Sequence, residues 1–253
     1  MPYVTVNDLR MYYDEDGSAA APSLVLLHGF QQSGDMWQHQ TPVFARHHRL
    51  LIPDLRGHGR TDNPGGLPAM NHRQFARDIV AFCAALGITR AAFCGESTGA
   101  MLLLTLGLDA PSLPRALILA GGTYEYDAQI RAWWRTQTPD SLVRDQAAAQ
   151  ARHIALGPDH WRRVSEAFIA LGTHAHSEDF PAAAELAGIH APTLIVHGDR
   201  DFFFPIRIPT EMYHLLPDAE LCILPKTGHA PPLERPEWFN TIVLDFLDRR
   251  ARS

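Results

Sequence analysis

The 253-residue chain has few cysteines. Cys83, Cys94 and Cys222 all lie in apolar stretches, and none has the spacing of metal ligands. This composition argues against a disulfide framework and against a zinc site. We expect all three cysteines in the core.

The chain also lacks a membrane-length apolar run and an excess of basic residues. Its first residues have neither the basic region nor the apolar stretch of a signal peptide. The net charge is −6, and acidic and basic residues are mixed along the chain, so nothing marks a surface for nucleic acid or for an anionic membrane. We expect a cytoplasmic protein with a small-molecule substrate and without nucleic-acid or membrane partners. No pattern indicates an oligomeric state.

Short apolar runs that alternate with helical segments predict a mostly parallel sheet with helices on both faces. A hairpin around Asn7-Asp8 pairs the first two predicted strands, 3–6 and 9–13. The six further predicted strands lie near 24–27, 49–53, 91–94, 116–120, 193–197 and 219–224. This pattern predicts an α/β fold with eight strands.

A long segment separates the strands that end near residue 120 and begin near residue 193, and it exceeds an ordinary crossover. Its composition is helical, with breaks at Pro139, Gly157-Pro158 and Gly172, which predict about four short helices over 126–187. We therefore expect an N-terminal core part (1–124), a helical cap (125–188) and a C-terminal core part (189–253). The last part ends in a helix that starts near Pro236.

The most informative motif is GESTG at residues 95–99, between an apolar strand and an apolar helix. A G-x-S-x-G sequence in this context is typical of a nucleophile elbow, a tight turn that exposes a serine hydroxyl. Ser97 is therefore the candidate nucleophile. A serine hydroxyl needs a base, and the base needs an orienting acid.

Candidates for both partners follow later predicted strands. Asp199 and Asp201 follow the strand near 193–197, and His229 follows the strand near 219–224. The chain order is Ser, Asp, His. This order resembles that of the α/β-hydrolase superfamily.

Two further segments carry the same resemblance. Residues 28–30 (HGF) look like the superfamily's oxyanion loop, and residues 54–59 (DLRGHG) resemble its turn after the next strand. The resemblance implies that the backbone N–H groups of Phe30 and Thr98 stabilise an oxyanion. It also places the catalytic acid at the fourth position of a Gly-x-x-Asp turn, which is Asp201, and leaves Asp199 as a turn residue.

Glu96 precedes the candidate nucleophile and has two interpretations. Its carboxylate either bonds to neighbouring loops behind the elbow or raises the basicity of His229.

The substrate pocket is expected under the cap. The cap aromatic residues either pack the cap onto the core or line an apolar pocket over Ser97. The pocket residues that we predict are Gln31, Trp133, Trp134, Trp161 and Phe202. Four cap histidines, His153, His160, His174 and His176, are interpreted as solvent-exposed side chains, because no carboxylate or cysteine completes a metal site.

The resemblance and the motifs together predict a serine hydrolase of the carboxylic-ester class that cleaves an ester or lactone of a small, largely apolar substrate. The nucleophile is serine and not aspartate, which disfavours epoxide and haloalkane chemistry. No cofactor and no metal are expected. Carbon–carbon bond hydrolysis, perhydrolysis and a receptor role with slow hydrolysis remain alternatives with the same triad.

Overall fold

The computed structural model describes residues 3–174 and 180–251. One eight-stranded sheet forms its centre, in the order β1-β2-β4-β3-β5-β6-β7-β8. The strands are β1 (Tyr3–Val6), β2 (Leu9–Asp16), β3 (Ser23–Leu27), β4 (Arg49–Pro53), β5 (Ala91–Glu96), β6 (Pro114–Ala120), β7 (Thr193–Gly198) and β8 (Ala219–Leu224). The pairs β1–β2 and β2–β4 are antiparallel, and all others are parallel. This confirms the predicted α/β-hydrolase fold.

Helices cover both faces of the sheet because the central strands are apolar on both sides. In β3, Val25 and Leu27 belong to one core, and Leu24 and Leu26 belong to the other. The first core packs against α2 (His72–Ala85), α3 (Thr98–Asp109) and α7 (Arg207–Leu215), and the second packs against α1 (Thr41–Phe44) and α9 (Pro236–Ala251). A continuous apolar strand is typical of a parallel sheet buried between two helical layers.

Local sequence signals fix the helix ends. The Asn71 side chain accepts the N–H of Gln74 at 2.9 Å and caps α2, as its sequence predicts. Shorter elements complete the core: η1 (Gly34–His39), η2 (Leu67–Ala69) and α8 (Pro231–Glu234). No helix of the described residues is both long enough and apolar enough to cross a membrane.

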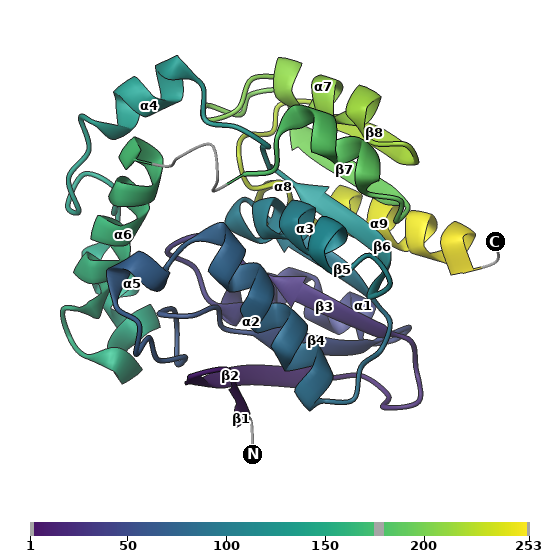
Figure 1. Ribbon diagram of the computed structural model, residues 1–253, viewed down its shortest axis with the longest axis horizontal. Helices are drawn as coiled ribbons and strands as arrows, with labels where there is room; N and C mark the ends of the chain where they lie inside the picture. The colour runs from purple at the N-terminus through teal and green to yellow at the C-terminus, as the bar shows by residue number, and fades with distance from the viewer. Residues whose placement is uncertain (1–2, 175–179, 252–253) are drawn as a thin grey trace.

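The segment between β6 and β7 is helical, and most of its helices lie together at the left of the molecule in Figure 1, whereas its last short helix packs against α3 and α7. It contains α4 (Ala128–Trp134), α5 (Gln146–His153), η3 (Ile154–Leu156), α6 (His160–His174) and η5 (Ala183–Gly188). The predicted break at Gly172 is wrong, because α6 continues through it. A Cβ at Gly172 would lie 2.3 Å from the Trp134 ring, so this glycine provides close packing and not a helix end.

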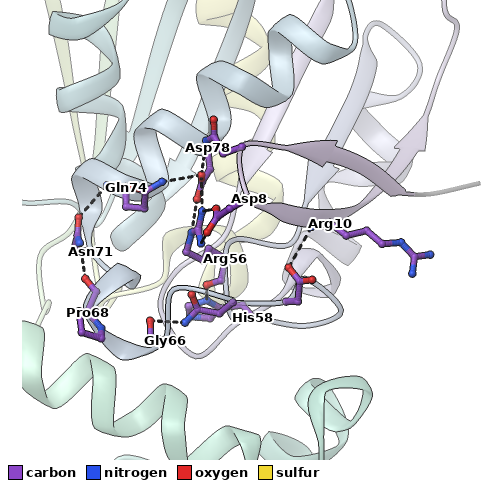
Figure 2. Close-up of polar contacts among 12 residues, drawn as sticks. Asp8, Arg10, Arg56, His58, Gly66, Pro68, Asn71, Gln74 and Asp78 are labelled. Atoms are coloured by element: carbon purple, nitrogen blue, oxygen red, sulfur yellow. Dashed lines mark hydrogen bonds and ion pairs between the residues drawn. The ribbon is translucent and has the colours of Figure 1, made fainter.

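Arg56 forms a buried ion cluster that joins three parts of the core. It lies in the loop after β4, between Asp8 of the β1–β2 turn and Asp78 of α2 (Figure 2). Its guanidinium donates to Asp78 at 2.7 and 3.0 Å and to Asp8 at 2.6 Å. The side chains of Asn7 and Gln74 also donate to Asp78, at 2.7 and 3.0 Å. The buried charges are therefore paired and hydrogen-bonded.

Substitution of Asp78 by alanine should destabilise the protein strongly, because it leaves the buried Arg56 with only the more exposed Asp8. We expect the free energy of unfolding to fall by about 3–5 kcal/mol in urea denaturation. Asp62→Ala is the control, because the exposed Asp62 carboxylate accepts the N–H of Arg10 at 3.2 Å. Equal stabilities of the two variants would contradict this account of the cluster.

Candidate active site

Ser97 occupies the tight turn between β5 and α3, with a φ of 50° and a ψ of −113°. Such a conformation is costly for a residue with a side chain and marks a constrained site. The flanking glycines make the turn possible. A Cβ at Gly95 would lie 2.2 Å from the carbonyl carbon and oxygen of Gly99, and a Cβ at Gly99 would lie 2.1 Å from the carbonyl oxygen of Leu27.

Three side chains from three loops form one hydrogen-bonded chain at the carboxyl ends of the strands. His229 Nε2 lies 2.9 Å from Ser97 Oγ, and His229 Nδ1 lies 2.9 Å from Asp201 Oδ2. Because a carboxylate accepts at Nδ1, that nitrogen carries the proton and Nε2 faces the serine as an acceptor. The geometry suits transfer of the Ser97 proton to His229.

Asp201 is held as a charged, fixed acceptor. Its Oδ1 accepts the N–H groups of Phe203 and Phe204 at 2.8 and 3.1 Å. Burial raises its pKa, but the hydrogen bond with His229, the charges of His229 and His197 and the bond from Phe204 together lower the pKa below its ordinary value. Asp199 has a different hydrogen-bond partner, because its carboxylate accepts the N–H of Thr227 at 3.1 Å.

Glu96 is the second carboxylate near the base. Its Oε1 lies 3.9 Å from His229 Nε2, and no hydrogen bond to its carboxylate is found among the described residues. Burial, opposed by the charge of His229, raises the pKa of Glu96 to about 7. Burial lowers the pKa of His229, but the bond to Asp201 and the charges of Asp201, Glu96 and Glu234 outweigh burial and raise it. Of the two interpretations of Glu96, the structure favours the one in which it acts on His229.

The backbone N–H groups of Phe30 and Thr98 have no hydrogen-bond acceptor among the described residues. Thr98 is the first residue of α3, where N–H groups have no partner within the helix. Phe30 belongs to a turn closed by the N–H of Gln32 and the carbonyl of Gly29 at 3.1 Å, with Gln31 at a φ of 63°. Both amides are available to an anionic oxygen.

Aromatic side chains cover the three-residue chain. The Phe203 ring lies 4.7 Å from the His229 ring, and Trp134 packs against both Phe203 and Phe168. Phe168 stacks on Phe30 with ring centroids 4.5 Å apart. Ser97 itself is only 6% exposed.

The five predicted pocket residues fall into separate groups. Gln31 and the buried Trp161 line one cavity of about 220 Å³. Trp134 is part of the aromatic cover. Trp133 contacts Phe202 at the edge of the cover, and Phe202 itself is 69% exposed. The structure therefore does not bring these five residues together around Ser97.

Two cap histidines join the cap to the core, which corrects their interpretation as solvent-exposed residues. His153 is buried, and its Nδ1 accepts the N–H of Gly59 at 2.9 Å. His160 is half-buried, and its Nε2 donates to the carbonyl of Gly57 at 2.9 Å. The N–H of Gly59 and the carbonyl of Gly57 both belong to the turn at residues 54–59. His176 and the side chain of His174 lie outside the described residues.

Phe168, Phe203 and Arg152 contribute to the site but were not among the residues predicted from the sequence. Phe168 shares one face of α6 with Trp161 and Ser165. Phe203 follows Asp201 by two residues, and the sequence does not show that its ring lies 4.7 Å from the ring of His229. No sequence signal distinguishes Arg152 from the other cap arginines. In residues 3–174 and 180–251, no three His, Cys, Asp or Glu side chains form a metal-binding group.

The fold and this geometry define an α/β hydrolase. A family model of the alpha/beta hydrolase fold matches residues 22–155, more than half of the chain. The chain belongs to the α/β-hydrolase family.

The chain is also similar to named relatives along its length. It is 28% identical over 263 residues to the "Putative carbamate hydrolase RutD" of Pantoea ananatis, covering 95% of this chain and 94% of that protein. It resembles the solved enol-lactonase of Burkholderia xenovorans LB400, with a TM-score of 0.78, 23% identity and coverage of 98% and 100%. Est816, an N-acyl homoserine lactone degrading enzyme, matches with a TM-score of 0.78, 26% identity and coverage of 97% and 100%. The enol-lactonase supports the fold, and the other two relatives support hydrolase activity.

The buried His153 should make stability depend on pH. Burial, with the neighbouring Arg152 and His160, lowers the pKa of His153 to about 3. A lowered histidine pKa gives stability that is present above the unfolded-state pKa and is lost as the pH falls. Because of His153, we expect the free energy of unfolding to fall by about 2 kcal/mol when the pH is lowered from 7 to 5.

His153→Asn keeps an acceptor for Gly59 and cannot be protonated, so urea unfolding at several pH values should show a smaller loss toward pH 5. The exposed His214→Asn should behave as the wild type. An identical pH slope in His153→Asn and the wild type would contradict the assignment.

Proposed function

We propose that this protein is a serine hydrolase that cleaves a carboxylic ester or lactone through an acyl-enzyme on Ser97. The observation that carries the proposal is the chain Ser97–His229–Asp201, with both contacts at 2.9 Å, beside two unbonded amides. This arrangement holds a nucleophile, a base, an orienting acid and oxyanion donors.

The reaction has two acyl-transfer steps. Ser97 Oγ attacks the substrate carbonyl while His229 Nε2 takes its proton, and the N–H groups of Phe30 and Thr98 stabilise the tetrahedral oxyanion. His229 then protonates the leaving alkoxide, which leaves an acyl-enzyme. Water, deprotonated by His229, releases the acid by the same route. Asp201 stays ionised throughout and stabilises the imidazolium.

The relatives suggest which carbonyl compounds to compare. The neighbour Est816, described as acting on N-acyl homoserine lactones, favours lactones. The name of the relatives in Pantoea ananatis makes carbamates the second candidate, because a carbamate presents a carbonyl to the same nucleophile. A panel of p-nitrophenyl acyl esters, lactones and aryl carbamates separates these classes by kcat/KM.

Substitution of Ser97 by alanine should lower kcat on the best substrate by at least about 10⁴-fold, because it removes the nucleophile. The exposed Ser112→Ala is the matched control and should keep wild-type activity. A fluorophosphonate should add one covalent group to the wild type, at Ser97 by peptide mass spectrometry, and none to Ser97→Ala. Multiple turnover in Ser97→Ala, or labelling elsewhere, would contradict the mechanism.

Glu96→Gln should move the acid limb of the kcat/KM profile to lower pH. The Glu96 charge, 3.9 Å from Nε2, favours protonated His229, so its removal lowers the pKa of the base. The same change should lower kcat at high pH, because the imidazolium formed in the reaction loses a stabilising charge. Glu237→Gln, an exposed change on α9, is the control. An unmoved acid limb would rule out this role.

A further inference from the structure

The cavity of about 220 Å³ adjoins the candidate oxyanion loop. Ser165 of α6 lines its cap side, and Gln31 lines its core side. The two side chains are hydrogen-bonded, with Gln31 Nε2 2.6 Å from Ser165 Oγ. Phe168 lies three residues after Ser165, about 4.5 Å further along the axis of α6. It stacks on Phe30. The cavity and the cover over Phe30 are therefore built on the same face of α6.

Arg152 of α5 brings a positive charge to the cavity without a balancing carboxylate. Its Nη1 donates to the carbonyl of Gln31 at 2.9 Å, and no acidic oxygen of the described residues lies within 4.0 Å of its guanidinium. Asp145, an acidic residue of the lining, accepts the N–H of Ala148 at 3.0 Å and caps α5. Burial lowers the pKa of Arg152, opposed only by the charge of Asp35. Arg152 thus has guanidinium donors left for another acceptor.

The other walls of the cavity suit an aliphatic chain that ends in an anion. Leu142, Val143 and Trp161 are apolar, and the exposed Arg144 adds positive charge at the rim. His153, also in the lining, has its pKa lowered to about 3 and stays neutral. A planar guanidinium in such surroundings binds a carboxylate with good geometry.

The mechanism gives the direction in which a substrate would enter this cavity. His229 must protonate the leaving group, so the leaving group lies on the side of His229 and Phe203. Gln31 directly follows Phe30, the candidate oxyanion donor, and lines the cavity together with Arg152. We therefore take the acyl chain to extend from the oxyanion site along this loop toward Arg152.

We propose that Arg152 binds a carboxylate at the far end of the acyl chain, so that the substrate is a monoester of a dicarboxylic acid or a lactone that carries a carboxylate. This inference rests on the proposed hydrolysis at Ser97 and names its substrate class.

The test compares p-nitrophenyl monoesters of dicarboxylic acids, from succinate to suberate, with neutral p-nitrophenyl alkanoates of the same acyl carbon number. Rates are corrected for spontaneous hydrolysis. At the chain length that spans from Ser97 to Arg152, kcat/KM for the acidic ester should exceed that of the neutral ester by about 10-fold or more. Arg152→Gln should remove this preference. Arg163→Gln, an exposed arginine of α6 outside the cavity lining, should keep it.

Calorimetry provides a readout without turnover. The dicarboxylate that matches the best ester should bind Ser97→Ala, and the binding should be lost in the double variant with Arg152→Gln. The ratio of kcat/KM for the acidic ester to kcat/KM for the neutral ester, measured within one variant, separates a loss of anion binding from a distorted loop. If Arg152→Gln lowers both rates equally, Arg152 only positions the Gln31 loop, and the proposal is overturned. Neutral esters cleaved without an acidic preference at any length would also overturn it and leave the hydrolase function standing. If no ester, lactone or carbamate is cleaved, the proposed function itself fails.

Discussion

The site depends on the close approach of α3 to the end of β3. Because Gly99 has no side chain, the first turn of α3 packs against the carbonyl of Leu27, and this contact brings the start of the helix beside the loop that carries Phe30. The same crossing forces Ser97 into its positive φ. One steric constraint therefore sets both the position of the serine hydroxyl and the two amides without an acceptor. A side chain at residue 99 would separate the candidate nucleophile Ser97 and the N–H of Thr98 from the N–H of Phe30.

Helix α6 positions the cap relative to the close approach of α3 and β3. One face of that helix presents Ser165 to Gln31 and Phe168 to Phe30, and Gly172 on the same face admits the Trp134 ring. Two histidine hydrogen bonds then fix the cap to the turn at residues 54–59. The bond at His153 requires a neutral imidazole, because its Nδ1 accepts the N–H of Gly59, so this histidine must stay uncharged while the pKa of His229 is shifted in the opposite direction. Burial without a carboxylate partner lowers the pKa of His153, and the hydrogen bond to Asp201 raises the pKa of His229.

The sequence was most informative where backbone geometry determines the residue type. The strand pattern, the Asn71 cap and the GESTG turn each reflect a local rule, and the structure has the expected elements at those positions. Prediction was poorest in the cap. Gly172 suggests a helix break until the Trp134 ring is seen against it, and Phe202 and Phe203 are indistinguishable until the amides that bind Asp201 turn one ring toward His229 and leave the other in solvent. The contacts of Gly172 with Trp134 and of Phe203 with His229 join residues far apart in the chain, and no period in the sequence records them.

The cap also explains why a nucleophile elbow alone does not define a substrate. The candidate catalytic side chains follow strands of the sheet, whereas three of the side chains proposed to contact an acyl chain belong to the helical segment between β6 and β7, namely Trp161, Ser165 and Arg152. Apolar walls discriminate weakly between chains that differ by a methylene group, whereas a buried polar group rejects a substrate that leaves it unpaired. Arg152 is such a group, since its charge is half-buried and has no carboxylate partner in the described protein. Selectivity in this enzyme should therefore depend more on one charge in the cap than on the extensive aromatic cover beside it.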